Sequence, residues 1–198
     1  MIAAAKAEGV RRIVYHSVMY PQIEAMPHHW KKLKVEEKII RSGLPYTILQ
    51  PASYMQNILP YWDAIASRGE YAIPYSVDAK FSPVDLNDVA EVAWQVLTDS
   101  HHNGAVYQLA GPERLSSRQI AEVMGKSFGR EVRPTKQNLV EWKALATSRR
   151  MASYSKKALV KMFEYYDQHG FAGSSIVLER LLGRRATTFS QFLSRPDK

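Results

Sequence analysis

Three ionisable residues recur at intervals of four in one charged segment of the chain: His28, Lys32 and Glu36. Residues four apart are neighbours on a helix, so these side chains would lie on a single helix face. A neutral imidazole can act as a general acid or base near neutral pH, and an ammonium group donates hydrogen bonds. The same spacing also fits a solvated helix face, because the surrounding segment is rich in other charged residues. Both interpretations stay open on these residues alone.

Other recognisable chemistry is scarce. The chain has no cysteine, which excludes disulfides, thiolate zinc sites, iron–sulfur clusters and a cysteine nucleophile. Its ten glycines form neither a Gly-x-Gly-x-x-Gly dinucleotide loop nor a Walker phosphate loop. Adjacent histidines occur at 28–29 and 101–102, but no nearby carboxylate completes a metal site. We therefore expect no metal.

The excess of positive charge indicates an anionic partner. Lys and Arg outnumber Asp and Glu by 27 to 19, which gives a net charge of +8. A dinucleotide phosphate would satisfy this charge as well as a nucleic acid would. The basic stretch 143–161 has no aromatic residues at stacking spacing and no recognisable binding motif, so we interpret it as a solvated helix surface and do not expect nucleic acid. We assign Asp85 and Asp88 a structural role, because both fall in the first turn of a predicted helix.

The elements that must position these residues are predicted to alternate between strand and helix. A β-branched run over 10–18 predicts a strand, helical spacing over 27–41 predicts a helix, and the apolar run 46–50 predicts a second strand. This order is one βαβ crossover of a parallel sheet. The further predicted elements are a helical tail over 1–9, a helix over 55–67, a strand over 71–74, an amphipathic helix over 85–97, a strand over 105–109, a helix over 116–128, a short strand from 132 and a mostly helical region over 136–197.

The fold class follows from this alternation. We expect an open α/β sheet with a helix-rich C-terminal part laid over one end. The 198 residues, of which 45% are hydrophobic and 23% charged, are typical of one soluble globular domain. No run approaches the roughly 20 apolar residues that span a bilayer, and the start lacks the layout of a secretory signal. We therefore expect a soluble, cytoplasmic protein without a membrane partner.

The order of several motifs resembles the NmrA-like family of atypical short-chain dehydrogenases/reductases. The motifs that carry the resemblance are AEGVRRIVYHS, HHWKKLKVEEKIIRSGLPYTIL, PASYMQN, FSPVDLNDVAEVA, AVYQLAGPERLSSRQIAEVMGKSFGREV and LLGRRATTFSQFL. The resemblance implies a Rossmann-type parallel sheet that binds NADP or NAD. It also implies that this chain corresponds to the second half of the Rossmann core, over 1–110, and a mostly helical substrate-binding part, over 111–198. In the family, the strand and glycine loop that seat the pyrophosphate come before the position of Met1.

The resemblance also implies roles for individual residues. Ser17 lies at the strand end where related enzymes place a serine that orients the substrate carbonyl. His28 stands where they have the catalytic tyrosine, and Lys32 matches the lysine that binds the nicotinamide ribose. Four residues, Pro51, Ala52, Tyr54 and Asn57, fall in the loop that lines the nicotinamide side. None of the eleven tyrosines has a lysine four residues later, so the Tyr-x-x-x-Lys pair of a working reductase is replaced by His28-x-x-x-Lys32.

Three functional hypotheses remain open. The first is an NAD(P)-binding oxidoreductase for a small carbonyl or quinone-like substrate, or a redox sensor that binds NADP without turnover. The second is a regulatory module that binds a protein partner, which the positive charge and the absent glycine loop would allow. The third is a truncated relic, in which a bared sheet edge would favour a homodimer.

Overall fold

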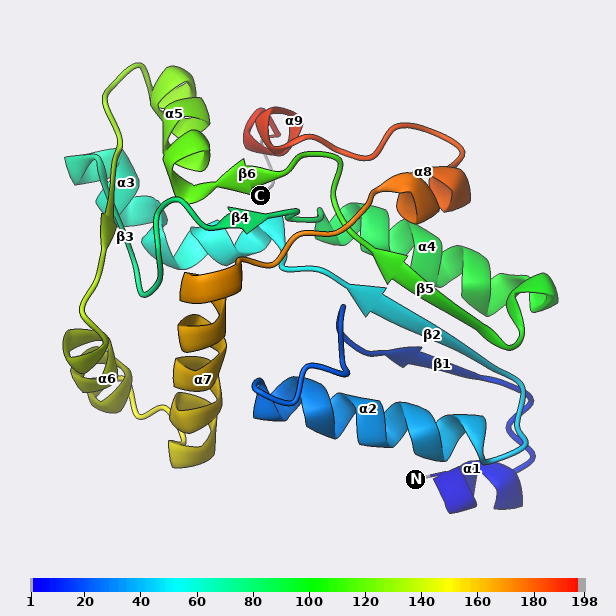
Figure 1. The fold of residues 1–198 in the computed structure, drawn as a ribbon. Coiled ribbons are helices and arrows are strands. Elements are labelled where there is room, and N and C mark those ends of the chain that lie inside the picture. Colours follow the sequence, from blue (N-terminus) through cyan, green and yellow to red (C-terminus); the bar gives the residue numbers. More distant parts are fainter. Residues whose placement is uncertain (1, 196–198) are drawn as a thin grey trace.

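A three-stranded parallel sheet lies between helices in the computed structural model, which describes residues 2–195 (Figure 1). Its strands are β1 (Ile13–His16), β2 (Tyr46–Pro51) and β5 (Ala105–Leu109), in the order β1-β2-β5. The register pairs Ile13 with Tyr46 and Thr47 with Ala105. Five of the six residues of β2 are buried, as expected for a central strand covered on both faces.

Helices cover both faces of this sheet. Figure 1 shows α2 (Pro27–Ile40) on one side and α4 (Leu86–Thr98) with α8 (Ile176–Leu182) on the other. The strand, crossover helix and parallel strand β1-α2-β2 form the predicted βαβ unit. The α/β fold with a parallel sheet and a helical C-terminal part is therefore confirmed.

Most of the remaining elements extend the molecule beyond the carboxyl ends of the strands, whereas residues 2–7 and 100–102 lie at the opposite edge of the sheet (Figure 1). They include two small strand pairs, β3 with β7 in parallel and β4 with β6 antiparallel, which do not join the main sheet. Their bounds are α1 (Ile2–Ala7), η1 (Met55–Tyr61), α3 (Trp62–Arg68), β3 (Glu70–Ile73), β4 (Lys80–Phe81), η2 (Ser100–His102), β6 (Leu115–Ser116), α5 (Ser117–Phe128), β7 (Arg133–Lys136), α6 (Leu139–Ser148), α7 (Ser153–His169) and α9 (Phe189–Leu193).

Most predicted elements are present, two differ from the prediction, and two short strands are additional. The strand expected over 10–18 is confined to β1, and the helix expected over 55–67 is a 3₁₀ helix followed by α3. Pro60 lies inside η1 and has no N–H to donate, which explains why a regular α-helix starts only after it. Strands β4 and β6 are two residues long and were not expected. The ends of the regions predicted over 1–9 and 136–197 include residues 1, 196 and 197, which lie outside the described residues.

Helix ends follow the sequence signals at three positions. The Asp85 carboxylate accepts a hydrogen bond from the Asn87 N–H and caps α4. Ser116 and Gln119 form a reciprocal capping box at the start of α5, and Gly129 ends that helix in a left-handed conformation. The structural role expected for Asp85 agrees with this geometry.

Two clusters of buried apolar side chains hold the molecule together. The first packs around the main sheet and includes Leu49, Val92 and Leu178. The second joins residues from before and after position 110, such as Ile65 and Phe189. No helix among residues 2–195 is long and apolar enough to cross a membrane.

Candidate active site

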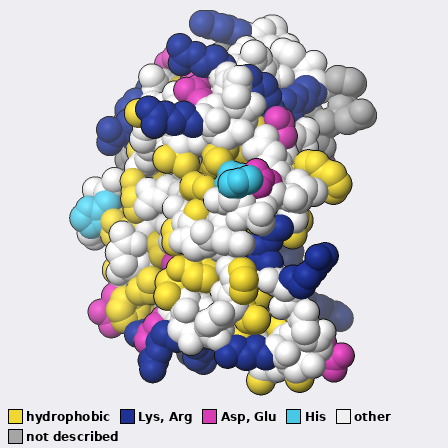
Figure 2. Space-filling view, turned by 90° about the vertical axis from the view of Figure 1, so that its right-hand side faces the viewer, with side chains coloured by type: hydrophobic (Ala, Val, Ile, Leu, Met, Phe, Trp, Pro, Cys, Tyr) yellow, Lys and Arg dark blue, Asp and Glu magenta, His cyan; other side chains and the backbone are white. Residues whose placement is uncertain are grey.

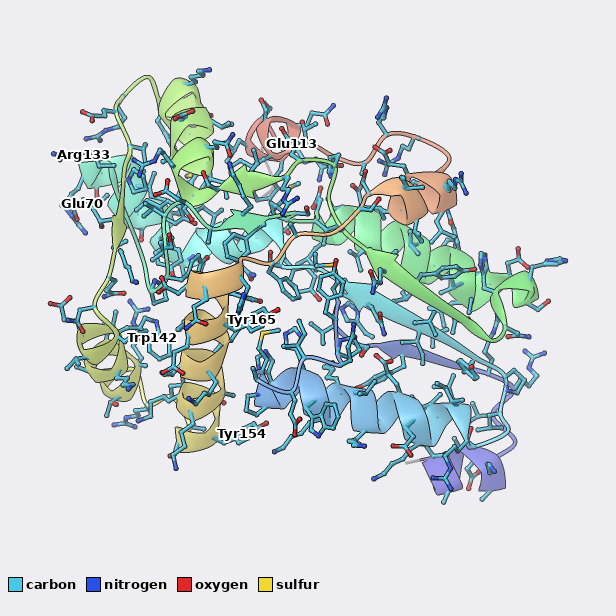
Figure 3. All side chains as sticks on the ribbon, in the orientation of Figure 1. Glu70, Glu113, Arg133, Trp142, Tyr154 and Tyr165 are labelled. Atoms are coloured by element: carbon cyan, nitrogen blue, oxygen red, sulfur yellow. The ribbon has the colours of Figure 1, made fainter. Side chains whose placement is uncertain are left out.

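A cavity of about 470 Å³ opens beyond the carboxyl ends of β1 and β2. In open α/β sheets, ligands characteristically bind at this edge, where loops leave the strands. The cavity lies between the loop after β2, the first turn of α2 and the C-terminal helices, of which α7 supplies a wall. Figure 3 shows Tyr154 and Tyr165 on the side of α7 that faces α2, with Trp142 between α6 and α7. The sheet and the helical C-terminal part therefore build this cavity together.

Five of the seven residues expected from the resemblance line this cavity. They are His28, Pro51, Ala52, Tyr54 and Asn57. Pro51 and Ala52 are buried at the end of β2, while Tyr54 is half-buried and Asn57 is exposed. Ser17 and Lys32 are not among its lining residues, although their neighbours in the chain and on the helix, Val18 and His28, are.

Ser17 makes a different contact from the one that the resemblance implied. Its buried hydroxyl donates to the Glu36 carboxylate, and Gln50 Nε2 donates to both oxygens of the same carboxylate at 3.0 Å. Glu36 is 4% exposed, so at this position α2 does not present the solvated face that its charge suggested. A buried carboxylate without such donors would be strongly unfavourable. This network ties α2 to the ends of β1 and β2.

Lys32 is half-buried and bonds to the end of β1. Its Nζ donates to the carbonyl oxygen of His16 at 2.7 Å and lies 5.2 Å from the centre of the Tyr15 ring. Burial lowers the pKa of Lys32, and the negative charge of Glu36 opposes that shift. The ammonium group is therefore held beside the loop after β1.

His28 brings an unpartnered polar atom to the cavity wall. Its Nδ1 is buried and has no hydrogen-bond partner among residues 2–195. Burial lowers the pKa of His28, and the charge of Lys32 lowers it further, so the ring is neutral at neutral pH. The His28 and His29 rings pack edge to face, with centroids 4.5 Å apart. A buried nitrogen without a partner is suited to a ligand that enters the cavity.

A histidine that sequence reasoning missed stands at the same edge. His16 is the last residue of β1, and its Nε2 lies 2.6 Å from the hydroxyl oxygen of Tyr54. Burial lowers the pKa of His16, with a further contribution from Lys32, and burial raises the pKa of Tyr54. The signal that could have revealed His16 is its position directly before Ser17 at a strand end of the predicted sheet.

Buried tyrosines and phenylalanines form the deep wall of the cavity. The Tyr75 ring packs on Phe81, Phe163 and Tyr166 with centroids 5.1 to 6.0 Å apart. Burial raises the pKa of Tyr71, Tyr75 and Tyr166 well above the usual value for phenols. These hydroxyls stay uncharged, so the wall is suited to an aromatic ligand without a deeply buried charge.

The residues present fit one end of a dinucleotide. The unpartnered Nδ1 of His28 and the buried wall at Pro51 and Ala52 offer a polar contact and a flat apolar contact for a nicotinamide ring. The glycine loop that would hold the pyrophosphate does not occur in the 198 residues. Among residues 2–195, no group of three or more His, Asp or Glu side chains is placed to hold a metal ion.

Comparison with known proteins identifies the family. Residues 1–193 match the NmrA-like family. The chain belongs to this family, which confirms the resemblance read from its motifs. It is 31% identical over 197 residues to an NAD(P)H azoreductase of Xenophilus azovorans, an alignment that covers 97% of this chain and 67% of that protein. It is 29% identical over 198 residues to quinone oxidoreductase 2 of Escherichia coli, covering 98% and 68% respectively.

Solved structures of NmrA-like and related proteins share the fold. The NADPH complex of an NADPH-dependent quinone oxidoreductase from Escherichia coli superposes with a TM-score of 0.85 at 26% identity, covering 98% of this chain and 68% of that one. A negative transcriptional regulator bound to NADP matches with a TM-score of 0.74 at 18% identity, covering 98% and 67%, a likeness that shows the fold alone. The chain thus spans about two thirds of the length of these proteins.

Proposed function

We propose that this NmrA-like protein is an NAD(P)H-dependent reductase for a small, planar conjugated acceptor such as a quinone. The observation that carries the proposal is the cavity at the carboxyl ends of the strands, where His28 and Tyr54 face a wall of uncharged aromatic side chains. The relatives named as an NAD(P)H azoreductase and a quinone oxidoreductase support it, since their names give an azo compound and a quinone as acceptors. NADPH is the preferred cofactor of the proposal because one related structure contains it, with NADH as the alternative.

The residues of this chain would bind and orient the reactants. When bound, a reduced nicotinamide supplies a hydride. Lys32 would hold the ribose hydroxyls, and the loop residues Pro51, Ala52, Tyr54 and Asn57 would contact the nicotinamide side. His28 would offer its free Nδ1 to the acceptor, and the aromatic wall would exclude water. Ser17, whose hydroxyl is held by Glu36, would act by fixing the loop after β1 rather than by touching the substrate.

A titration with NADPH, followed by tryptophan fluorescence, tests the cofactor role. Trp30 lies on α2 two residues before Lys32, so binding there should quench its emission in a saturable way. We expect Lys32→Met to weaken binding at least about tenfold, since a charged hydrogen bond contributes roughly 1.5 to 3 kcal/mol. Lys38→Met is the matched control, because Lys38 is exposed on the same helix. Equal affinity of all three proteins would contradict the role given to Lys32.

A second candidate is an interaction role, which one surface observation favours. Trp94 and Leu97 of α4 and Val106 of β5 are 68%, 56% and 45% exposed. Figure 2 shows hydrophobic patches between lysine and arginine side chains on the face where β2 and β5 begin, away from the cavity. Light scattering over a range of protein concentrations tests self-association. A strict monomer at every concentration would count against a homodimer, and Trp94→Ala should disrupt a dimer that uses α4.

A further inference from the structure

His16 and Tyr54 are joined by a hydrogen bond across the carboxyl end of the sheet. His16 ends β1 and Tyr54 follows β2, and Nε2 of the first lies 2.6 Å from the hydroxyl oxygen of the second. The two rings meet edge to face, with centroids 6.2 Å apart. Tyr54 lines the cavity, whereas His16 is exposed to solvent. One hydrogen bond therefore connects the cavity with the molecular surface.

Both members of the pair are uncharged near neutral pH. Lys32 reaches from α2 to the carbonyl oxygen of His16, and its charge, together with burial, lowers the pKa of His16. Glu36, one turn further along α2, is engaged by Ser17 and Gln50. Tyr54 keeps its hydroxyl proton because burial raises its pKa. A neutral imidazole can take a proton at one ring nitrogen while it gives one from the other.

We propose that His16 and Tyr54 form a proton relay that carries a proton from solvent to the acceptor in the cavity. The proposal rests on the reductase function proposed above. Tyr54 is the catalytic acid because it lines the cavity, and His16 is a positioning and relay residue that acts through Tyr54. This pair takes the place of the Tyr-x-x-x-Lys acid that the sequence lacks, with the tyrosine supplied by the loop after β2 instead of α2.

The transfer balances as one proton in and one proton out. The acceptor receives a hydride from reduced nicotinamide dinucleotide and a proton from the Tyr54 hydroxyl, whose O–H bond breaks. The Tyr54 oxygen takes the proton of His16 Nε2, and His16 Nδ1 takes a proton from hydronium or a buffer acid in the solvent, which is the one proton that the reduction consumes. The histidine remains neutral and returns to its first tautomer by exchange with solvent. Hydride and proton together give the reduced acceptor.

His28 is less suited to this task. Its Nδ1 is buried without a hydrogen-bond partner among the described residues, so no contact shows how a proton given from this atom would be replaced. His16 is in contact with solvent and has a bond to a cavity residue. The difference assigns proton supply to His16 and Tyr54, and leaves His28 to contact the ligand.

The chain offers a matched control pair. His102 Nδ1 lies 2.9 Å from the hydroxyl oxygen of Tyr107, and these rings also meet edge to face. Neither residue lines the cavity. Tyr107→Phe therefore removes a phenol that is bonded to a histidine without touching the proposed relay.

The test combines turnover with a measurement that does not need turnover. NADPH-dependent reduction of a quinone is compared at several pH values for the wild type, Tyr54→Phe, His16→Gln and Tyr107→Phe. We expect Tyr54→Phe to lower kcat about 100-fold and His16→Gln roughly tenfold, both with KM within about twofold, because loss of a general acid costs two orders of magnitude or more. Added imidazole should partly restore His16→Gln, and Tyr107→Phe should match the wild type.

The second measurement is nuclear magnetic resonance of the His16 ring nitrogens in the protein without ligand. The shift of Nε2 should change in Tyr54→Phe and stay unchanged in Tyr107→Phe. Unchanged His16 nitrogens in Tyr54→Phe would overturn the relay whether or not the protein turns over. Wild-type kcat in Tyr54→Phe would overturn it while leaving the reductase intact. A folded wild type without any reduction of acceptor would instead refute the proposed function.

Discussion

The positive charge of Lys32 acts on the histidines near the cavity, among them His16 and His28. His16 and His28 both have a lowered pKa, caused first by burial and then by Lys32. Because the ammonium group opposes protonation of each ring, it helps to keep both imidazoles neutral. One side chain therefore links cofactor binding, the end of β1 and the protonation of the proposed proton-handling residues.

Replacing this charge should raise both histidine pKa values. In Lys32→Met, burial remains and the repulsion disappears, so the pKa of His16 and of His28 should move up toward 6.5 without passing it. Titration of the ring protons by nuclear magnetic resonance measures this, with Lys38→Met as the control. Unchanged values in Lys32→Met would show that the charge does not reach the two rings.

His29 should make the fold sensitive to mild acid. The residue is 1% exposed, and burial lowers its pKa to about 4. The unfolded chain binds the proton near pH 6.5 and the folded protein does not, so stability falls as the pH drops from about 6.5 toward about 4. We expect about 2 kcal/mol to be lost from this residue between roughly pH 7 and pH 5. Urea unfolding at both pH values measures the loss.

The matched variant is His29→Phe, which keeps a ring to pack against Phe171, now 5.5 Å from the His29 ring centre. Its stability should depend less on pH than that of the wild type. His101→Gln, at an exposed histidine, should behave as the wild type does. An equal pH dependence of stability in all three proteins would mean that folding does not lower the pKa of His29.

Residue types predicted part of the site and not its contacts. The spacing of His28, Lys32 and Glu36 predicted one helix face. In the structure His28 lines the cavity, Lys32 bonds to the end of β1 and Glu36 is buried. The spacing could not show that Glu36 is buried, because its partners Ser17 and Gln50 come from the loop after β1 and from β2. Nor could it show the bond between His16 and Tyr54, which are 38 positions apart in the chain.

At the scale of elements, one arginine joins β1 to the end of α4. The half-buried Arg12 donates from its guanidinium to the carbonyl oxygens of Val96 and Leu97, each at 2.9 Å, and to that of Asp99. The last carbonyls of a helix have no partner within the helix, and positive charge is favourable there. This contact fixes α4 against the first strand of the sheet.

Removal of this cap should destabilise the protein modestly. Arg12→Met leaves the α4 carbonyls without their charged donor, for which we expect a loss of about 1 to 2 kcal/mol. Urea unfolding should show a lower midpoint with an unchanged slope. Arg11→Met changes an exposed neighbour and should cost little. Equal stability of the two variants would contradict the capping role.

A close approach of two loops makes one glycine indispensable. A Cβ at Gly111, which follows β5, would lie 1.7 Å from the carbonyl oxygen of Pro83, a residue that lines the cavity. Gly111→Ala should therefore cost roughly 3 kcal/mol and disturb ligand binding. Gly183→Ala meets open space at a positive φ of 66°, so it should cost only about 1 kcal/mol. Thermal unfolding of both variants checks this order.

Elements were predictable where local signals act alone. The helix predicted over 116–128 matches α5, and the apolar run 46–50 matches the central strand β2. The 3₁₀ helix around Pro60 and the two-residue strand β4 were not predicted, because their conformation depends on packing with distant segments.

At the scale of the molecule, the cavity joins parts that are far apart in the sequence. Its aromatic wall draws Tyr75 and Phe81 from one region and Phe163, Tyr166 and Phe171 from α7 and the loop after it. Hydrophobic periodicity in the sequence does not predict that these distant segments come into contact. The motif resemblance predicted the fold and the family correctly, while the shape and polarity of the acceptor site needed the structure.

The most direct test of the account is NADPH oxidation by the purified protein with a quinone as acceptor, followed by the loss of reduced-nicotinamide absorbance. We predict oxidation that depends on the quinone, with one NADPH consumed per quinone reduced, and a marked loss of rate in Lys32→Met but not in Lys38→Met. A folded protein that neither binds NADPH nor oxidises it with any quinone or azo acceptor would contradict the account and favour the interaction role.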